Sequence, residues 1–288
     1  MPEVKIGIIG GSGLYNMKGM SEMEEIQIST PFGEPSHSIL LGKIKGVGVA
    51  FLPRHGKGHH ISPSELPAKA NIYALKSLGV ERIISVSAVG SLKEDIQPLD
   101  LVIPDQLIDY TKSRDSTFFV DGIVGHISFA DPFCPELSRV LFEAATKTGA
   151  KVHKRGTYIA MEGPQFSTKA EAQLYRSWGA DIIGMTACPE AKLAREAEIC
   201  YATIAFVTDY DCWHPDYASV TTEMILTNLG KGVDTAKKIL GLAIPTIPKK
   251  RNCACAAALE DAIATSPKHI SDKARKDLDL LIRDYLNG

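Results

Sequence analysis

Short apolar runs alternate with longer helical patterns along almost the whole chain of 288 residues. Residues 4–9 and 82–88 are apolar, β-branched runs that stop at turn residues, and residues 201–207 are apolar without interruption. An uninterrupted run is typical of a strand in the middle of a sheet that is covered on both faces. The alternation predicts an α/β fold with a mixed, mostly parallel central sheet flanked by helices. We expect a single domain over residues 1–288, with a C-terminal helical tail from about residue 245.

Turn and cap residues mark where the predicted elements begin and end. Residues 38–41 and 47–52 form a predicted hairpin around a turn at 43–46. Thr168 and Glu171 have the spacing of a capping box at the start of a helix over residues 168–178. The remaining predicted strands cover residues 101–103, 158–161 and 181–185, and the remaining helices cover residues 62–78, 137–147, 189–198, 222–242 and 272–286.

The charge balance and the hydropathy pattern exclude some classes of protein. The chain has 32 lysines and arginines against 34 aspartates and glutamates, a formal net charge of −2. A general nucleic-acid-binding protein usually has a basic excess, so we expect no nucleic-acid partner. No apolar run reaches the roughly 18 residues that span a bilayer, and no basic, apolar leader opens the chain. We therefore expect a soluble, cytoplasmic protein without a membrane partner.

Polar residues follow several predicted strands, at the edge of an α/β sheet where ligands bind. The Gly-Gly-Ser-Gly segment at residues 10–13 and the small-residue turn at 87–91 let backbone N–H groups approach an anion closely. Arg54 and His55 follow the strand at 47–52, and a guanidinium is a planar donor suited to phosphate oxygens. Each turn alone is as typical of a plain connection as of a binding site.

A pair of carboxylates follows the uninterrupted apolar strand. Asp209 and Asp211 are two residues apart, so their side chains point the same way if the strand geometry continues. Carboxyl groups next to a buried strand can have a raised pKa, whereas an exposed Asp-x-Asp is a common loop feature. Anion donors beside a carboxylate pair indicate a site for an anion next to a base or a sugar.

Dinucleotide and metal chemistry have weaker signals. The segment at residues 10–13 departs from the G-x-G-x-x-G pattern of a dinucleotide site, since Asn16 stands where the last glycine would fall. His59 and His60 have no carboxylate or cysteine at ligand spacing, so we interpret them as solvated loop residues. We expect no metal site.

Six cysteines leave two interpretations open. Four of them are scattered, and the last two form a C-x-C pair: Cys134, Cys188, Cys200 and Cys212, then Cys253 and Cys255. One interpretation is that they are buried thiols that act as small hydrophobic groups. The other is that they form stabilising disulfides of a thermostable intracellular protein, with a C-x-C bridge and a Cys134–Cys200 bridge as candidates. A zinc site is disfavoured, because no second close pair of ligands accompanies the C-x-C pair.

Taken together, these segments resemble the purine nucleoside phosphorylase superfamily, and within it the enzymes that cleave 5′-methylthioadenosine. The resemblance runs from Val4 to about Leu242 and depends on the order of its motifs. They are the segments at 4–13, Thr30-Pro31-Phe32-Gly33, Arg54-His55-Gly56, Ala70-Asn71-Ile72, Glu162-Gly163-Pro164-Gln165-Phe166-Ser167 and 208–213. The resemblance implies a nucleoside phosphorylase-like fold and a pentosyltransferase activity. Such an enzyme converts 5′-methylthioadenosine, and also adenosine, to adenine and a pentose 1-phosphate, which is 5-methylthioribose 1-phosphate for the former.

The resemblance also implies roles for individual residues. The implied phosphate site comprises Ser12, Arg54, His55, Ser87, Ala88 and Thr186. The implied nucleoside site comprises Phe166, Ser167, Met185, Asp209, Asp211 and His126. His126 would enter the 5′ pocket of a neighbouring subunit, and Ser167 and Thr222 would contribute to specificity. Asp209 would be the catalytic general acid.

The implied chemistry needs no metal ion and no organic cofactor, because inorganic phosphate is the co-substrate and the nucleophile. Negative charge below the sugar stabilises an oxocarbenium-like transition state. A protonated Asp209 makes adenine a better leaving group if burial raises its pKa. The implied partners are a nucleoside and phosphate, bound by a homotrimer or homohexamer.

Two alternatives stay open at this point. A phosphorylase of 6-oxopurine nucleosides would have an amide in place of Asp209, because an amide donates to O6 whereas a carboxylate accepts from the 6-amino group of adenine. A non-catalytic nucleotide-binding or dinucleotide-dependent protein on the same sheet would leave Arg54, His55 and the carboxylate pair unexplained.

Overall fold

The computed structural model describes residues 4–14, 20–215 and 222–286 and, of residues 12, 222–227 and 229, the backbone only. The strands in this part are β1 (Ile6–Gly10), β2 (Met20–Ile26), β3 (Ile39–Ile44), β4 (Val47–Pro53), β5 (Arg82–Ser91), β6 (Leu101–Val102), β7 (Gln106–Tyr110), β8 (Val152–His153), β9 (Thr157–Met161), β10 (Ile182–Gly184) and β11 (Cys200–Asp209). The α-helices are α1 (Ala68–Ser77), α2 (Pro135–Thr146), α3 (Lys169–Ser177), α4 (Ala187–Glu196), α5 (Thr222–Ala243) and α6 (Asp272–Ile282).

All of these strands belong to one sheet, and β5 is the strand on which it converges. The main order of strands is β2-β3-β4-β1-β5-β10-β9-β7. A branch leaves this order at β5, where β11 pairs with β5 and with β6, and β6 pairs in turn with β8. β5 pairs in parallel with β1 and β11 and, near its carboxyl end, antiparallel with β10. β3 and β4 form the predicted antiparallel hairpin. The sheet is therefore mixed with a majority of parallel pairs, which confirms the predicted fold class.

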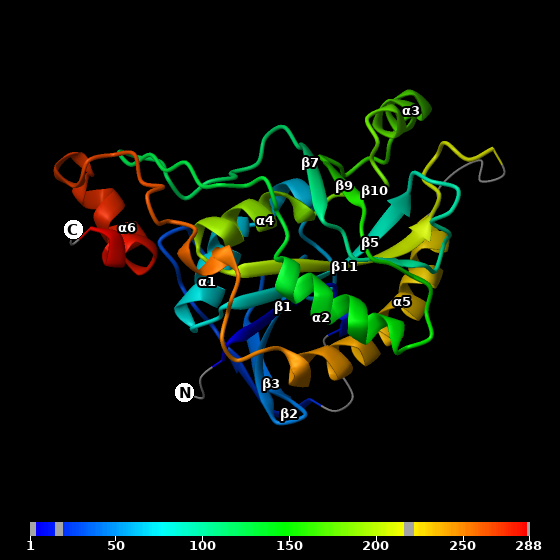
Figure 1. Ribbon diagram of the computed structural model, residues 1–288, viewed down its shortest axis with the longest axis horizontal. Helices are drawn as coiled ribbons and strands as arrows, with labels where there is room; N and C mark the ends of the chain where they lie inside the picture. Colours follow the sequence, from blue (N-terminus) through cyan, green and yellow to red (C-terminus); the bar gives the residue numbers. More distant parts are fainter. Residues whose placement is uncertain (1–3, 15–19, 216–221, 287–288) are drawn as a thin grey trace.

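Helices cover both faces of the sheet (Figure 1). α1 and α4 share an apolar core with one face, and α2 and α5 share another core with the opposite face. All ten residues of β11 are buried between these layers, as the uninterrupted apolar run predicts. Within the described residues, no helix combines the length and the apolar character that crossing a bilayer requires.

Several boundaries differ from the sequence expectation for identifiable reasons. The helix predicted over residues 62–78 begins only at Ala68, because Leu66 precedes Pro67 and takes an extended conformation with φ −59° and ψ 124°. The edge strands β2 and β7 are not predicted, since neither has an alternation of buried and exposed residues. At α3 the prediction is confirmed, because the Glu171 N–H donates to the Thr168 hydroxyl over 3.2 Å.

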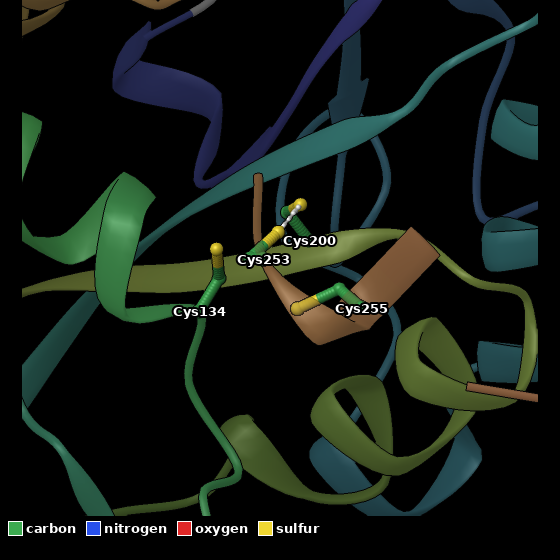
Figure 2. A group of neighbouring side chains, drawn as sticks. All are labelled: Cys134, Cys200, Cys253 and Cys255. Atoms are coloured by element: carbon green, nitrogen blue, oxygen red, sulfur yellow. Dashed lines mark hydrogen bonds between the residues drawn. The ribbon is translucent and has the colours of Figure 1, made fainter. Parts of the chain in front are cut away.

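The disulfide prediction is wrong, because all six cysteines are free thiols. Neither the C-x-C pair nor Cys134 and Cys200 are bridged. The distance of 3.3 Å between the Cys200 and Cys253 sulfurs is well beyond the roughly 2.05 Å of an S–S bond. Cys134, Cys200, Cys253 and Cys255 nevertheless lie together at the amino end of β11 (Figure 2).

Candidate active site

A cavity of about 700 Å³ lies at the carboxyl ends of the central strands. Its lining comes from segments that follow β1, β4, β9 and β10, from the last residues of β5 and β11, and from α5. Ligands bind at this edge of an open α/β sheet, because the loops that follow neighbouring strands converge there. Most of the predicted site residues line this one cavity: Arg54, His55, Ser87, Ala88, Phe166, Met185, Thr186, Asp209 and Asp211.

Arg54 is only 2% exposed and is held by an acidic partner that the sequence does not reveal. Its Nε and Nη2 donate to the two carboxylate oxygens of Glu190, over 2.5 and 3.1 Å. Nη2 also donates to the Ser85 hydroxyl, and Nη1 donates to the Val86 carbonyl over 3.0 Å. Among the described residues this leaves one Nη1 hydrogen for a ligand. Glu190 is 136 residues from Arg54, and no local pattern connects them.

His55 is a neutral imidazole at physiological pH. Burial and then the neighbouring Arg54 charge lower the pKa of His55 to about 4. The carbonyl of Ile61 lies 2.9 Å from Nδ1 and can only accept, so Nδ1 carries the proton and Nε2 is an acceptor. The His59 ring, which also lines the cavity, stacks on His55 with ring centroids 4.2 Å apart. His59 is an exposed turn residue, as expected from the sequence, and it also lies at the cavity.

Two buried hydroxyls complete the donor side of the cavity. The Ser87 and Thr186 oxygens lie 3.1 Å apart, although the residues are 99 positions apart in the sequence. The antiparallel pairing of β10 with β5 explains this, because Ile183 lies opposite Gly90 and places residue 186 beside residue 87. Ser12 begins the 3-10 turn Ser12–Leu14 between two cavity-lining glycines, and its side chain lies outside the described residues.

Asp209 and Asp211 both line the cavity, but by a different geometry from the one expected. A bulge between Val207 and Asp209 interrupts the pairing with β5, and bulges commonly redirect a side chain near an active site. Asp211 has a left-handed φ of 51°, so the strand does not continue to it. Instead, the Asp211 N–H donates to the Asp209 carboxylate over 2.8 Å, and this turn holds the two carboxyl groups together.

Burial raises the pKa of both carboxyl groups. For Asp209, the effect of burial on the pKa is larger than the opposite effect of two hydrogen bonds that favour the charged form, from the Thr208 hydroxyl and the Asp211 N–H. For Asp211, burial raises the pKa to about 6, against a hydrogen bond from Ser167 and with the added repulsion of Asp209. The Asp211 Oδ2 is buried without a hydrogen-bond partner among the described residues, which further disfavours a charge there. Both carboxyl groups therefore keep a proton at a higher pH than an exposed aspartate does.

The remaining predicted residues fall in three different places. Phe166, 47% exposed, and Met185 line the cavity, and Ser167 lies next to it beside Asp211. His126 is exposed and outside the cavity lining, with its N–H donating to the Ala262 carbonyl. Thr222 is the first residue of α5, and its side chain lies outside the described residues.

One further supporting residue escapes prediction from the sequence. The Asn228 amide, on α5, donates to the Thr208 carbonyl over 2.7 Å and fixes the end of β11 just before Asp209. Asparagine within a helical pattern has no local signature of this role, because the contact depends on how α5 packs on the sheet.

One cavity of this α/β sheet holds both anion donors and a carboxylate pair that can be protonated. This arrangement is typical of the class of proteins that bind an anion together with an organic group that forms hydrogen bonds. The sequence model of the phosphorylase superfamily matches residues 5–244, and the chain belongs to this superfamily.

Individual relatives are similar over nearly their full length. An S-methyl-5′-thioadenosine phosphorylase of Koribacter versatilis is 54% identical, over 98% of this chain and 97% of the relative. The crystal structure of a methylthioadenosine phosphorylase from an antarctic soil metagenomic library has a TM-score of 0.93 at 50% identity, covering 98% of this chain and 99% of that one. An adenosine/methylthioadenosine phosphorylase variant from Schistosoma mansoni, solved with adenine, has a TM-score of 0.85 at 36% identity, covering 91% and 99%.

Proposed function

We propose that this chain is a pentosyltransferase that cleaves 5′-methylthioadenosine with inorganic phosphate, giving adenine and 5-methylthioribose 1-phosphate. The observation that carries the proposal is the union, in one cavity, of Arg54, Ser87 and Thr186 with the Asp209–Asp211 pair. The relatives named above support this choice of substrate, since several of them are methylthioadenosine phosphorylases. The Schistosoma enzyme supports adenosine as a second substrate.

Phosphate binds on the donor side of the cavity. The remaining Nη1 hydrogen of Arg54 and the hydroxyls of Ser87 and Thr186 donate to its oxygens, as do backbone N–H groups of the turn that contains Ser12 and of the stretch at Ala88. Neutral His55 presents Nε2 as an acceptor, so it takes a hydrogen bond from the protonated oxygen of hydrogen phosphate. The bound dianion then lies close to the sugar, where it stabilises positive charge and attacks the anomeric carbon.

The base binds against the carboxylate pair. A protonated Asp209 donates to N7 of adenine, which lets the departing base leave as a neutral molecule. The carboxyl oxygens of Asp209 and Asp211 accept from the 6-amino group, and Ser167 hydrogen-bonds to Asp211. Phe166 contributes an aromatic wall beside the base, and Met185 lies under the sugar. A 6-oxopurine offers no amino hydrogen here, so the site favours adenine.

The 5′ end of the substrate is completed by a second subunit. His126 is exposed and outside the cavity lining of its own chain, which is the arrangement expected if it enters a neighbour's cavity. Thr222 shapes the same pocket from the start of α5. We therefore include in the proposal a homotrimer or homohexamer that acts in the cytoplasm and uses phosphate as co-substrate, with no organic cofactor.

The test is a substrate panel with and without phosphate, in which the free base is quantified. We expect phosphate-dependent release of adenine from methylthioadenosine and, more slowly, from adenosine, with little release of hypoxanthine or guanine from inosine or guanosine. Preferential release of the 6-oxopurines would replace the proposal with the alternative phosphorylase. Binding of these nucleosides without release of any base would replace it with a non-catalytic nucleotide-binding protein.

A further inference from the structure

Four cysteines meet at the end of the sheet opposite the cavity. Cys134 precedes α2, Cys200 begins β11, and Cys253 and Cys255 belong to the 3-10 turn at Ala254–Ala257 and its cap. Their four sulfurs all lie within 4.8 Å of one another, and those of Cys200 and Cys253 are 3.3 Å apart (Figure 2). Three segments that are far apart in the sequence therefore place their thiols around one point.

We propose that Cys134, Cys200, Cys253 and Cys255 bind one zinc ion as a structural tetrathiolate site. Zinc–sulfur bonds of about 2.3 Å in a tetrahedron place the sulfurs about 3.8 Å apart, so the cluster needs only small shifts to close on the ion. The four thiols supply a complete ligand set with no open position, as in structural rather than catalytic zinc sites. Binding displaces the thiol protons, which leave to solvent.

The burial of the cluster fits a closed site with one route of entry. Cys134, Cys200 and Cys255 are 2% exposed or less, whereas Cys253 is half-buried. A zinc ion with four thiolates has a net charge of −2, so it requires nearby positive partners or donors when it is buried. Half-burial of Cys253 gives the ion a path from solvent, and full burial of the others excludes water as a ligand.

A helix N-terminus and a guanidinium lie near the sulfurs. Cys134 is the N-cap residue of α2, where the helix dipole favours negative charge. The Arg195 guanidinium contributes a positive charge near Cys255. Arg195 also donates to the Ser128 and Asp131 carbonyls, just before Cys134. The helix N-terminus and the Arg195 charge partly offset the negative charge of a zinc tetrathiolate.

The ion would fix a C-terminal segment that has little regular structure of its own. Residues 247–271 contain only short 3-10 turns, yet they pair with the loop that carries His126. The Val124 N–H donates to Thr265, the His126 N–H donates to the Ala262 carbonyl, and Gly125 bridges to Ile263. Joining Cys253 and Cys255 to the first residue of β11 anchors this segment to the sheet.

The site is separate from the chemistry of the cavity. β11 is ten residues long, which puts Asp209 about 30 Å from Cys200. The zinc ion therefore contributes to stability, and its loss should leave the turnover number at 25 °C within about twofold as long as the chain stays folded.

The test is the zinc content of the full-length protein, purified under reducing conditions and measured by mass spectrometry of the elements. We expect one zinc per chain in the wild type and in Cys212→Ser, a control outside the cluster whose hydroxyl can keep the hydrogen bond to the Ser167 carbonyl. The double variant Cys253→Ser/Cys255→Ser should contain no zinc and unfold about 10 °C lower. Should this variant fail to fold, cobalt uptake by the stripped wild type decides, and we expect the visible spectrum of a tetrahedral cobalt tetrathiolate.

Two results would overturn the proposal. One is a wild-type protein that contains no zinc and, with its four thiols reduced, takes up neither zinc nor cobalt, which would identify the cluster as buried apolar thiols. The other is zinc retained in full by the double variant, which would place the ion elsewhere. Equimolar iron in place of zinc would overturn the identity of the ion.

Discussion

The two ends of β11 carry two clusters of opposite character. At the carboxyl end, Asp209 joins Asp211 and a set of anion donors around an open cavity of about 700 Å³. At the amino end, Cys200 joins three other thiols whose sulfurs lie within 4.8 Å of one another. The first cluster leaves space for a ligand and holds carboxyl groups with raised pKa values, whereas the second is closed around a single point. One strand thus connects a site suited to chemistry with a site suited to stability.

The difference also explains which cluster the sequence predicts. Most of the predicted residues of the cavity lie at or just after the carboxyl end of a strand, and these ends meet at one edge of the sheet, so short motifs in order indicate where the site is. The cysteines come from three segments, and Cys200 and Cys253 are 53 residues apart. No rule of local spacing brings these segments together, so the sequence does not predict the cluster.

The largest expected effect is at the carboxyl end of β11. Asp209→Asn removes the proton donor to the base, so kcat/KM for methylthioadenosine should fall by about 10²–10⁴-fold. Because an amide donates to O6, the loss for 6-oxopurine nucleosides should be much smaller, and the preference should shift towards them. Steady-state kinetics with both substrates measure this, with exposed Asp279→Asn on α6 as the matched control. An unchanged ratio of the two kcat/KM values would remove Asp209 from base recognition.

The next effect separates the two roles of Arg54. Arg54→Ala leaves the Glu190 carboxylate buried without its partner, which should cost about 3–5 kcal/mol of unfolding free energy and also raise the KM for phosphate. The double variant Arg54→Met/Glu190→Gln removes both charges and keeps an acceptor for the Tyr201 hydroxyl, so it should regain most of the stability. The KM for phosphate should stay raised in both variants. Recovery of the phosphate KM together with stability would show that Arg54 only supports the fold.

A smaller effect tests the hydroxyl donors. Ser87→Ala should raise the KM for phosphate roughly 10- to 100-fold, the range for losing one hydrogen bond to a charged group, and leave the KM for the nucleoside nearly unchanged. Ser177→Ala, on the exposed end of α3 away from the cavity lining, serves as the control. Equal increases in both KM values would indicate that Ser87 shapes the cavity as a whole.

The smallest effect concerns the pH dependence of stability. Asp211 holds its proton up to a pKa of about 6 in the folded chain, against 3.8 as its ordinary value, so the folded state binds more protons between these values. The free energy of unfolding therefore falls as pH rises through this window. Asp211→Asn abolishes this loss, and asparagine tolerates the left-handed backbone there. The Tm of the variant minus that of the wild type should be larger at about pH 7.5 than at about pH 4; a difference independent of pH would contradict the burial of this charge.

Local signals in the sequence predict most of the fold and much of the cavity. Contiguous residues carry the signal for the buried run of β11, for the capping box at Thr168 and for the turn at Arg54. The turn predicted at residues 87–91 is wrong, because β5 continues to Ser91 and Ser87 lies within that strand. Glu190 and Asn228 have no such signal, because their contacts to Arg54 and to the Thr208 carbonyl exist only after helices pack on the sheet. The edge strand β2 is not predicted, because five of its seven residues are exposed and no buried face imposes an alternation of apolar and polar residues on its sequence.

The most direct test of the account is a mass balance of the reaction with limiting phosphate. With methylthioadenosine in excess, we expect one adenine and one 5-methylthioribose 1-phosphate for each phosphate consumed, and no adenine in phosphate-free buffer. Chromatography of the base and phosphorus NMR of the sugar product give both quantities in one sample. Adenine released without phosphate, together with free methylthioribose, would mean that water is the nucleophile and would contradict the assignment of Arg54, Ser87 and Thr186 to a phosphate site.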